Sequence, residues 1–393
     1  MTPNTTDVTP GTTGDILLTG TTGFVGMELL ARYLQRSERD VVTLVRASSH
    51  EGARSRVDAV LDNLFGDAAE EYRPRVRALA ADMTAPGLGL TDSERAEVAE
   101  RVTKIVHSAA SVSFTLPLEE ARAINREGTR RMLELAELAR ANGGLECYAH
   151  ISTAFVAGDH PGSFAECDHN VGQTFHNSYE QSKFEAEELI RSHDGLPYTI
   201  LRPSIVVGDR NNGWTSAFNV LYWPLRAFAR GLFTAVPAIP SAPVDVVSID
   251  YVADAAYQLC ETSCGNGATY HLTAGEHAST IAELAGLASR YFRRPVPRVV
   301  PPAEFATMTL GAAERKALEA GSEYFPYFCM EGSFDDRETR KRLEPEGITT
   351  APLRDYVDRL LDFATRARWG KRPIARADAF AADAYPLPLR AAS

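Results

Sequence analysis

The sequence predicts an α/β fold built on a doubly wound parallel sheet, with a smaller and mainly helical carboxyl-terminal lobe. Three observations support this prediction. The first half alternates short β-branched runs with helical patterns, as strands joined by crossover helices do. A glycine-rich turn joins the first run to the first helical pattern. The regular alternation ends after Gly208, where aromatic residues and prolines become frequent.

The alternation predicts each element in order along the chain. The expected strands are Asp15–Thr19, Val41–Val45, Val76–Ala80, Lys104–His107, Tyr148–Ser152, Tyr198–Pro203, Val244–Ile249 and Ala268–Leu272. The first helix follows the glycine turn, with Leu29, Leu30, Tyr33 and Leu34 on its inner face. A long helix is expected over 117–141, where apolar residues recur near helical spacing, and another over 252–260.

The change of pattern predicts a division into two parts. The sheet domain is expected to comprise 14–210 plus 244–275, and the second lobe 211–243 plus 276–393. Residues 1–13 are rich in threonine, proline and glycine and are expected to form a disordered tail. A ligand is then expected in the crevice outside the carboxyl ends of the strands.

Composition excludes several classes of function. The formal net charge of −11 argues against a nucleic-acid partner. The five cysteines are odd in number and form no CxxC pair, which favours reduced thiols over a disulfide framework or a zinc site. No amino-terminal signal is recognised, and no apolar stretch is long enough to span a bilayer. The chain is therefore expected to be soluble and cytoplasmic, with an oligomeric state that the sequence does not specify.

The glycine turn is typical of a dinucleotide site. Gly20, Gly23 and Gly26 stand where the first strand passes into the first helix. The first glycine permits the tight turn, the second permits close approach of a pyrophosphate, and the third permits close packing of helix and strand. The free N–H groups and partial positive charge of the helix N-terminus favour phosphate binding.

The end of the second strand favours NADPH over NADH. An NAD-selective site would place an acidic residue there for the ribose hydroxyls. The strand instead ends in Arg46, and Arg56 follows ten residues later. Guanidinium groups suit a 2′-phosphate through paired charge-assisted hydrogen bonds. Asp82, after the third strand, is expected either to accept a hydrogen bond from the adenine amino group or to cap a turn.

Tyr179 and Lys183 are the expected centre of a carbonyl-reduction site. Four residues apart on a helix, they share a face. The lysine ammonium would lower the pKa of the tyrosine from about 10 by roughly two to three units, so that the phenol can exchange a proton near neutrality. Thr153, at the end of the fifth strand, is expected to hydrogen-bond the substrate oxygen.

Other polar residues of this region have supporting or structural interpretations. Asn125, in the long helix, could hold a water that links Lys183 to solvent, or could simply lie on the helix surface. His107, His150 and His176 match no metal-binding spacing, so each is interpreted as a structural histidine. Ser152 lacks the G-x-S-x-G context of a serine hydrolase.

Together these residues resemble the extended short-chain dehydrogenase/reductases, and within them the branch of thioester reductases and fatty acyl-CoA reductases (male sterility NAD-binding proteins). The resemblance covers about residues 14–275. It is carried by the stretches 19–26, 44–46, 82–90, 106–114, 150–155, 175–187, 201–208 and 244–254. The carboxyl-terminal lobe resembles the branch only loosely.

The resemblance implies a function and a set of site residues. Thr153, Tyr179 and Lys183 would be the catalytic residues, and Arg46 and Arg56 the 2′-phosphate ligands. The further cofactor-binding residues that it implies are Thr22, Phe24, Val25, Met83, Ser108, Ala109, Ala110, Pro203, Ser204 and Val206.

The expected reaction is NADPH-dependent reduction of an acyl thioester, delivered by CoA or a carrier protein, to an aldehyde or onward to an alcohol. Two alternatives stay open: an extended short-chain dehydrogenase acting on a nucleotide sugar or a hydroxysteroid-like compound, and a non-catalytic nucleotide sensor. The apolar segment 214–240 would line a channel for a long acyl chain, or form lobe core or a dimer contact. Its large side chains are Trp214, Phe218, Leu221, Tyr222, Trp223, Phe228 and Phe233.

Overall fold

The computed structural model describes residues 14–142, 144–218 and 220–382. The expected tail over 1–13 lies outside these residues. The core is a parallel sheet of seven strands in the order β12-β7-β5-β4-β1-β2-β3, which confirms the doubly wound α/β prediction. The strands are β1 (Asp15–Thr19), β2 (Val41–Val45), β3 (Val76–Ala80), β4 (Val102–His107), β5 (Cys147–Ile151), β7 (Tyr198–Pro203) and β12 (Thr269–Leu272).

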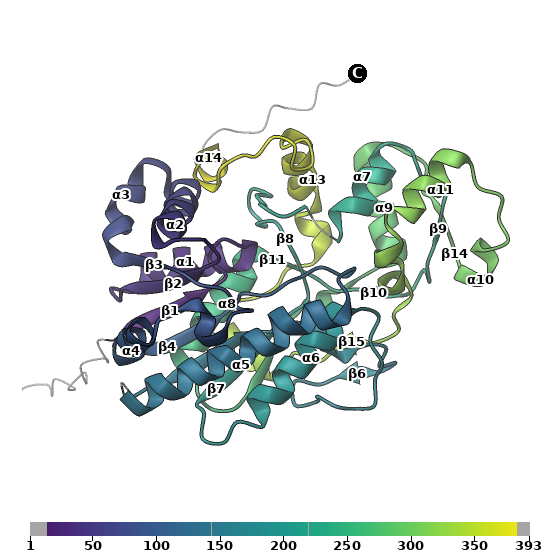
Figure 1. Cartoon of the computed structure of the whole chain (residues 1–393). Coiled ribbons are helices and arrows are strands. Elements are labelled where there is room, and N and C mark those ends of the chain that lie inside the picture. The colour runs from purple at the N-terminus through teal and green to yellow at the C-terminus, as the bar shows by residue number, and fades with distance from the viewer. Residues whose placement is uncertain (1–13, 143, 219, 383–393) are drawn as a thin grey trace, which may run out of the picture.

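Helices cover both faces of the sheet (Figure 1). The helices are α1 (Phe24–Arg36), α2 (His50–Phe65), α4 (Asp92–Arg101), α5 (Leu118–Asn142), α6 (Ser178–Arg191) and α8 (Ile249–Thr262). Because successive strand residues face opposite sides, Leu17 packs toward α4, α5 and α6, whereas Ile16 and Leu18 pack toward α1, α2 and α8. Short connecting helices are η1 (Gly66–Ala68), α3 (Ala69–Tyr72), η2 (Arg73–Arg75), η3 (Pro86–Gly89) and η4 (Ala154–Ala157).

A second group of elements lies beyond the sheet, around α7 and α9 (Figure 1). Its helices are α7 (Tyr222–Ala229), α9 (Ile281–Phe292), α10 (Pro302–Phe305), α11 (Ala312–Glu319), η5 (Gly275–His277) and η6 (Ser322–Cys329). Its short strands and those that join it to the sheet are β6 (Ser163–Phe164), β8 (Ile205–Val207), β9 (Ala235–Pro237), β10 (Pro243–Val244), β11 (Val246–Ser248), β13 (Ser279–Thr280), β14 (Arg298–Val300) and β15 (Ser333–Phe334).

The last segments return toward the sheet. They are α12 (Arg337–Leu343), η7 (Glu344–Glu346), η8 (Leu353–Asp355), α13 (Val357–Arg366) and α14 (Arg376–Ala382). The α12 helix contacts α8 and β12, and α14 contacts α2, beside which Figure 1 shows it in yellow. The division of the chain into two domains at the expected boundaries stays a prediction.

The strand expected over 244–249 is wrong as a single element. Residues 243–244 pair antiparallel with β13, while 246–248 pair parallel with β8. Between them, the Asp245 carboxylate accepts a hydrogen bond from the Ala274 backbone N–H at 2.7 Å. The α8 helix begins directly after the second piece and runs to Thr262, so it is longer than the expected 252–260.

The expectation that all cysteines are reduced is also wrong. Cys147, at the start of β5, forms a disulfide with Cys264, which lies between α8 and β12, and their Cα atoms are 5.5 Å apart. The two residues are 117 positions apart in the sequence and meet only because β5 and β12 both pair with β7. Cys167, Cys260 and Cys329 are free thiols.

Removing this disulfide is expected to lower the free energy of unfolding by on the order of 4 kcal/mol, because a cross-link over so long a loop restricts the unfolded chain. The measurement is guanidinium unfolding of the double variant Cys147→Ser/Cys264→Ser under oxidising conditions. Cys167→Ser, which removes an exposed free thiol, is the matched control. Equal unfolding midpoints for the double variant and the parent protein would contradict the expectation.

No helix of the described residues is long and apolar enough to cross a membrane.

Candidate functional site

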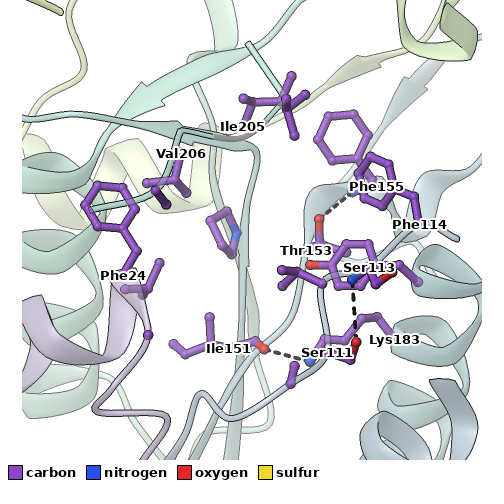
Figure 2. A pocket seen from close by; sticks show the side chains of 18 of the residues that line it. Phe24, Ser111, Ser113, Phe114, Ile151, Thr153, Phe155, Lys183, Ile205 and Val206 are labelled. Carbon is purple, nitrogen blue, oxygen red and sulfur yellow. Dashed lines mark hydrogen bonds between the residues drawn. The ribbon is translucent and has the colours of Figure 1, made fainter. Parts of the chain in front are cut away.

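A cavity of about 640 Å³ opens at the carboxyl ends of β1, β4, β5 and β7. The glycine turn and residues 203–206 line one side, where Figure 2 shows Phe24 and Val206. The loop after β4, the residues after β5 and the start of α6 line the other side, with Phe114, Thr153 and Phe155. The predicted site residues that line it are Gly20, Gly23, Phe24, Val25, Gly26, Ser108, Ala110, Thr153, Tyr179, Lys183, Pro203, Ser204 and Val206.

The glycine turn has the geometry of a dinucleotide cradle. Gly20 adopts a φ of +79°, a conformation that other residues rarely take, and its carbonyl accepts from the Gly23 N–H at 2.8 Å. A Cβ at Gly26 would lie 2.0 Å from the Gly20 oxygen, so only glycine lets α1 approach the turn. The N-cap Gly23 offers no side-chain oxygen to the first N–H groups of α1, which leaves these donors available to phosphate oxygens.

Thr22, Arg46 and Arg56 lie together outside this cavity, beyond the end of β2. The Arg56 guanidinium donates to the Arg46 carbonyl and, at 3.4 Å, to the Thr22 hydroxyl. Both arginines are exposed. Two guanidinium groups therefore flank the side of the glycine turn at which the adenosine ribose of a bound dinucleotide is expected.

Replacing both arginines by alanine is expected to lower kcat/KM for NADPH by at least about 100-fold and to leave that for NADH nearly unchanged, because each lost charge-assisted hydrogen bond is worth about 1.5–3 kcal/mol. Steady-state kinetics with both cofactors measure the ratio. Arg77→Ala, which removes a half-buried guanidinium of β3 that is bonded to Glu97 of α4, is the control. An unchanged NADPH/NADH ratio in the double variant would contradict the assignment.

Asp82 and Met83 lie in the turn after β3, also outside the cavity lining. The Asp82 carboxylate accepts hydrogen bonds from the Thr84 backbone and hydroxyl at 2.8 and 2.7 Å, and these bonds hold its pKa below the ordinary value. Asp82 thus caps its own turn, and its adenine contact stays a prediction. Met83 packs beneath Gly128 of α5, so it helps to place this turn against the helix.

Thr153 and Tyr179 form the reactive corner of the cavity. Thr153 is the N-cap of η4, and its hydroxyl accepts from the Phe155 N–H at 3.3 Å. The expected lowering of the Tyr179 pKa is wrong: burial raises it to about 12, although a hydrogen bond to Thr153 acts in the opposite direction. Tyr179 is therefore a neutral phenol that can donate its proton.

Lys183 is held beneath this corner, where Figure 2 shows it beside Ile151. Its Nζ donates to the Ile151 carbonyl at 2.8 Å and lies 2.8 Å from His150 Nε2. Burial lowers the pKa of Lys183 to about 7, while the charge of Glu187 opposes the shift. His150 is fully buried, and its pKa is lowered first by burial and then by the charge of Lys183, so it is a neutral acceptor for the ammonium.

His107 belongs to the same buried layer. Its Nδ1 lies 2.8 Å from the Thr19 hydroxyl, whose oxygen also accepts from the N–H groups of Ser108 and Ala109. Because the Thr19 oxygen accepts twice, its own hydrogen points to Nδ1, which places the imidazole proton on Nε2. His107 thus holds the loop after β4 beside the glycine turn. Among the described residues no group of three or more metal-ligating side chains occurs.

Asn125 is buried in α5 instead of lying on the helix surface. Its Nδ2 donates to the Ser111 carbonyl at 3.0 Å and to the Ser182 hydroxyl at 2.9 Å, and its Oδ1 accepts from the Ser111 N–H at 2.8 Å. Asn125 therefore ties the loop after β4 to the helix that carries Tyr179 and Lys183. A water relay through this residue stays a prediction.

The apolar segment 214–240 contributes little to the cavity. Of its described residues, only Ala217 and Val220 line the cavity, whereas Trp214, Leu221, Tyr222, Phe228 and Phe233 are buried in the hydrophobic core. The burial of these five side chains supports the interpretation of the segment as core, and a channel for a long acyl chain stays a prediction.

Several lining residues were not identified from the sequence. Tyr324 and Tyr327 of η6 lie far from the other site residues in the chain, and no local pattern marks them. His150, which the sequence interprets as structural, does not line the cavity but contacts Lys183. Its position on β5, three residues before Thr153, is the signal that points to the site.

Comparison with known proteins places this geometry in a family. A family model described as male sterility protein matches residues 18–256. An isonitrile lipopeptide synthase of Streptomyces coeruleorubidus is 34% identical over 222 residues, which are 55% of this chain and 15% of that protein. A fatty acyl-CoA reductase of Drosophila melanogaster is 29% identical over 240 residues, which are 53% of this chain and 46% of that protein. The chain thus spans less than half the length of both relatives.

Among solved structures, the terminal R domain from the myxalamid PKS-NRPS biosynthetic pathway superposes with a TM-score of 0.77 at 25% identity. The match covers 93% of this chain and 94% of that domain. The likeness therefore extends past the region of the family model into the carboxyl-terminal segments.

Proposed function

The chain belongs to the male sterility protein family of NAD-binding domains, and on this premise we propose that it is an NADPH-dependent reductase of acyl thioesters. The acyl group is delivered by CoA or by a carrier protein, and the product is an aldehyde or, after a second round of reduction, an alcohol. The observation that carries the proposal is the convergence of Thr153, Tyr179 and Lys183 on the cavity that the glycine turn lines.

The chain's own residues supply the proton chemistry. When bound, NADPH supplies a hydride to the carbonyl carbon of the thioester. Tyr179 donates its proton to the carbonyl oxygen as negative charge develops there, and Thr153 hydrogen-bonds the same oxygen. The resulting hemithioacetal loses the thiol and leaves the aldehyde. Lys183 returns a proton to Tyr179.

A direct reduction fits the lining of the cavity. No cysteine lines it among the described residues, so no thiolate is placed to form an acyl-enzyme. The arginines beyond β2 support NADPH as the cofactor, because they suit the 2′-phosphate.

The test is incubation with NADPH and a panel of acyl thioesters, both CoA-bound and carrier-bound, following loss of NADPH absorbance and identifying products by mass. Aldehyde or alcohol formed in proportion to NADPH consumed is the expected result. A nucleotide-sugar epimerase would give product without net NADPH oxidation. Absence of NADPH consumption with every thioester, CoA-bound or carrier-bound, would reject the proposal.

A further inference from the structure

The wall of the cavity that faces the glycine turn is aromatic. The Phe114 ring lies 5.8 Å from that of Tyr179 and 5.4 Å from that of Tyr327, with which it stacks. Phe155 meets Tyr327 edge to face at 5.1 Å, and Tyr324 meets Phe114 edge to face at 5.9 Å. We name Phe114, Phe155, Tyr324 and Tyr327 the aromatic wall. These side chains come from three segments of the chain and meet beside the proposed proton donor.

The aromatic wall is held to the catalytic helix itself. The Tyr327 hydroxyl donates to Glu180, the residue after Tyr179, whose side chain is fully buried. The Asn177 side-chain amide donates to the Tyr327 oxygen at 2.7 Å. The rings therefore keep a defined position relative to the Tyr179 hydroxyl, as a specificity surface requires.

Behind the wall the space is small. A second cavity, bordered by Phe155, Ile205, Val220 and Tyr327, has a volume of only about 40 Å³. This recess is far smaller than the main cavity of about 640 Å³, so it adds little room for an extended alkyl chain. The main cavity must also accommodate the reactive end of the dinucleotide, which leaves room beside the wall for a short acyl group.

The charges of the cavity exclude an anionic acyl group. Lys183 and Glu323 are the only charged side chains among the described residues that line it. The Lys183 ammonium is already bonded to Ile151 and His150. Glu323 lies beside Tyr324 at the wall, where its charge helps to raise the pKa of the Tyr324 phenol. A carboxylate at the far end of an acyl group would meet no free cation there and would be repelled by Glu323.

We propose that the site takes thioesters of short, uncharged acyl groups that carry a planar ring, and that it rejects acyl groups that end in a carboxylate. The inference rests on the proposed reductase function. A substrate ring gains edge-to-face and offset-stacked contacts with the aromatic wall that an alkyl chain cannot make. Glu323 supplies the discrimination against anions.

The first test compares three N-acetylcysteamine thioesters. Their acyl groups are 3-phenylpropionyl, nonanoyl, which has the same number of carbon atoms but no ring, and glutaryl, which ends in a carboxylate. We expect kcat/KM for 3-phenylpropionyl to exceed that for nonanoyl at least about tenfold, consistent with one or two aromatic contacts. The glutaryl thioester should react at least about 100-fold more slowly than 3-phenylpropionyl, because its carboxylate stays unpaired. Equal or faster reduction of nonanoyl or glutaryl would overturn the proposal.

The second test changes the wall. Phe155→Ala should reduce the preference for 3-phenylpropionyl over nonanoyl to about threefold or less, because it removes one ring of the wall.

The third test changes the charge beside the wall. Glu323→Arg should raise kcat/KM for the glutaryl thioester at least about tenfold by supplying a cation for its carboxylate. The matched control is Glu319→Arg, which makes the same charge change at an exposed position of α11 outside the lining. A glutaryl gain that is equal in the control, or absent in Glu323→Arg, would contradict the role of Glu323.

Binding separates this inference from the proposed function. Calorimetry with the corresponding amides, which cannot be reduced, measures the ring and charge preferences without turnover. Selective binding of the 3-phenylpropionyl amide, with no reduction of any thioester, would reject the reductase and keep the acyl site. Reduction of thioesters without either preference would keep the reductase and reject the acyl site.

Discussion

Replacing Tyr179 by phenylalanine is expected to lower kcat/KM by about 10²- to 10⁴-fold, the range attributed to a positioned general acid. The substitution removes the only group of Tyr179 that reaches the reacting oxygen, while the ring that packs against Phe114 at 5.8 Å is retained. The dissociation constant for NADPH should therefore change by less than about twofold, since the cofactor turn is untouched. Steady-state kinetics and fluorescence titration of NADPH measure the two quantities.

Tyr148→Phe is the control for this result. It also removes a buried phenol hydroxyl, but one that lies outside the cavity and has no hydrogen-bond partner among the described residues. Its activity should stay close to that of the parent protein. Retention of most activity by Tyr179→Phe would refute the role of Tyr179 as proton donor.

Lys183 is expected to set the pH dependence of the reaction. Burial lowers its pKa to about 7, so the ammonium that returns a proton to Tyr179 is lost as the pH rises through this value. The rate kcat/KM should therefore fall about tenfold per pH unit above pH 7, as a single ionisation requires. Lys183→Met should lower kcat/KM by about 100-fold at pH 7 and abolish this dependence.

The control for the pH profile is Lys104→Met. Lys104 is also buried, but it is bonded to Glu261 and lies outside the cavity. Its replacement should leave the decline above pH 7 in place. A decline that persists in Lys183→Met, or a rate that rises between pH 7 and 9 in the parent protein, would show that another group titrates.

Much of the nucleotide half could be predicted from the sequence because its signals are local. The run Asp15–Thr19, the glycines after it and the helix that follows are each recognised from neighbouring residues, and the structure confirms these elements. Tyr179 and Lys183 likewise share one helix, so their common face follows from helical periodicity alone. The family follows from the same local stretches.

Contacts between distant residues were decided only by the tertiary structure. The disulfide joins cysteines 117 positions apart, and Tyr327 reaches Glu180 across 147 positions. The hydrogen-bond partner of Lys183 is His150, which lies on β5 and not on the helix of Lys183. Burial sets the direction of the Tyr179 pKa shift. A residue's own neighbours in the chain fix its backbone preference and its periodicity. Its burial and its long-range partners depend on how the strands order themselves in the sheet, which no local pattern encodes.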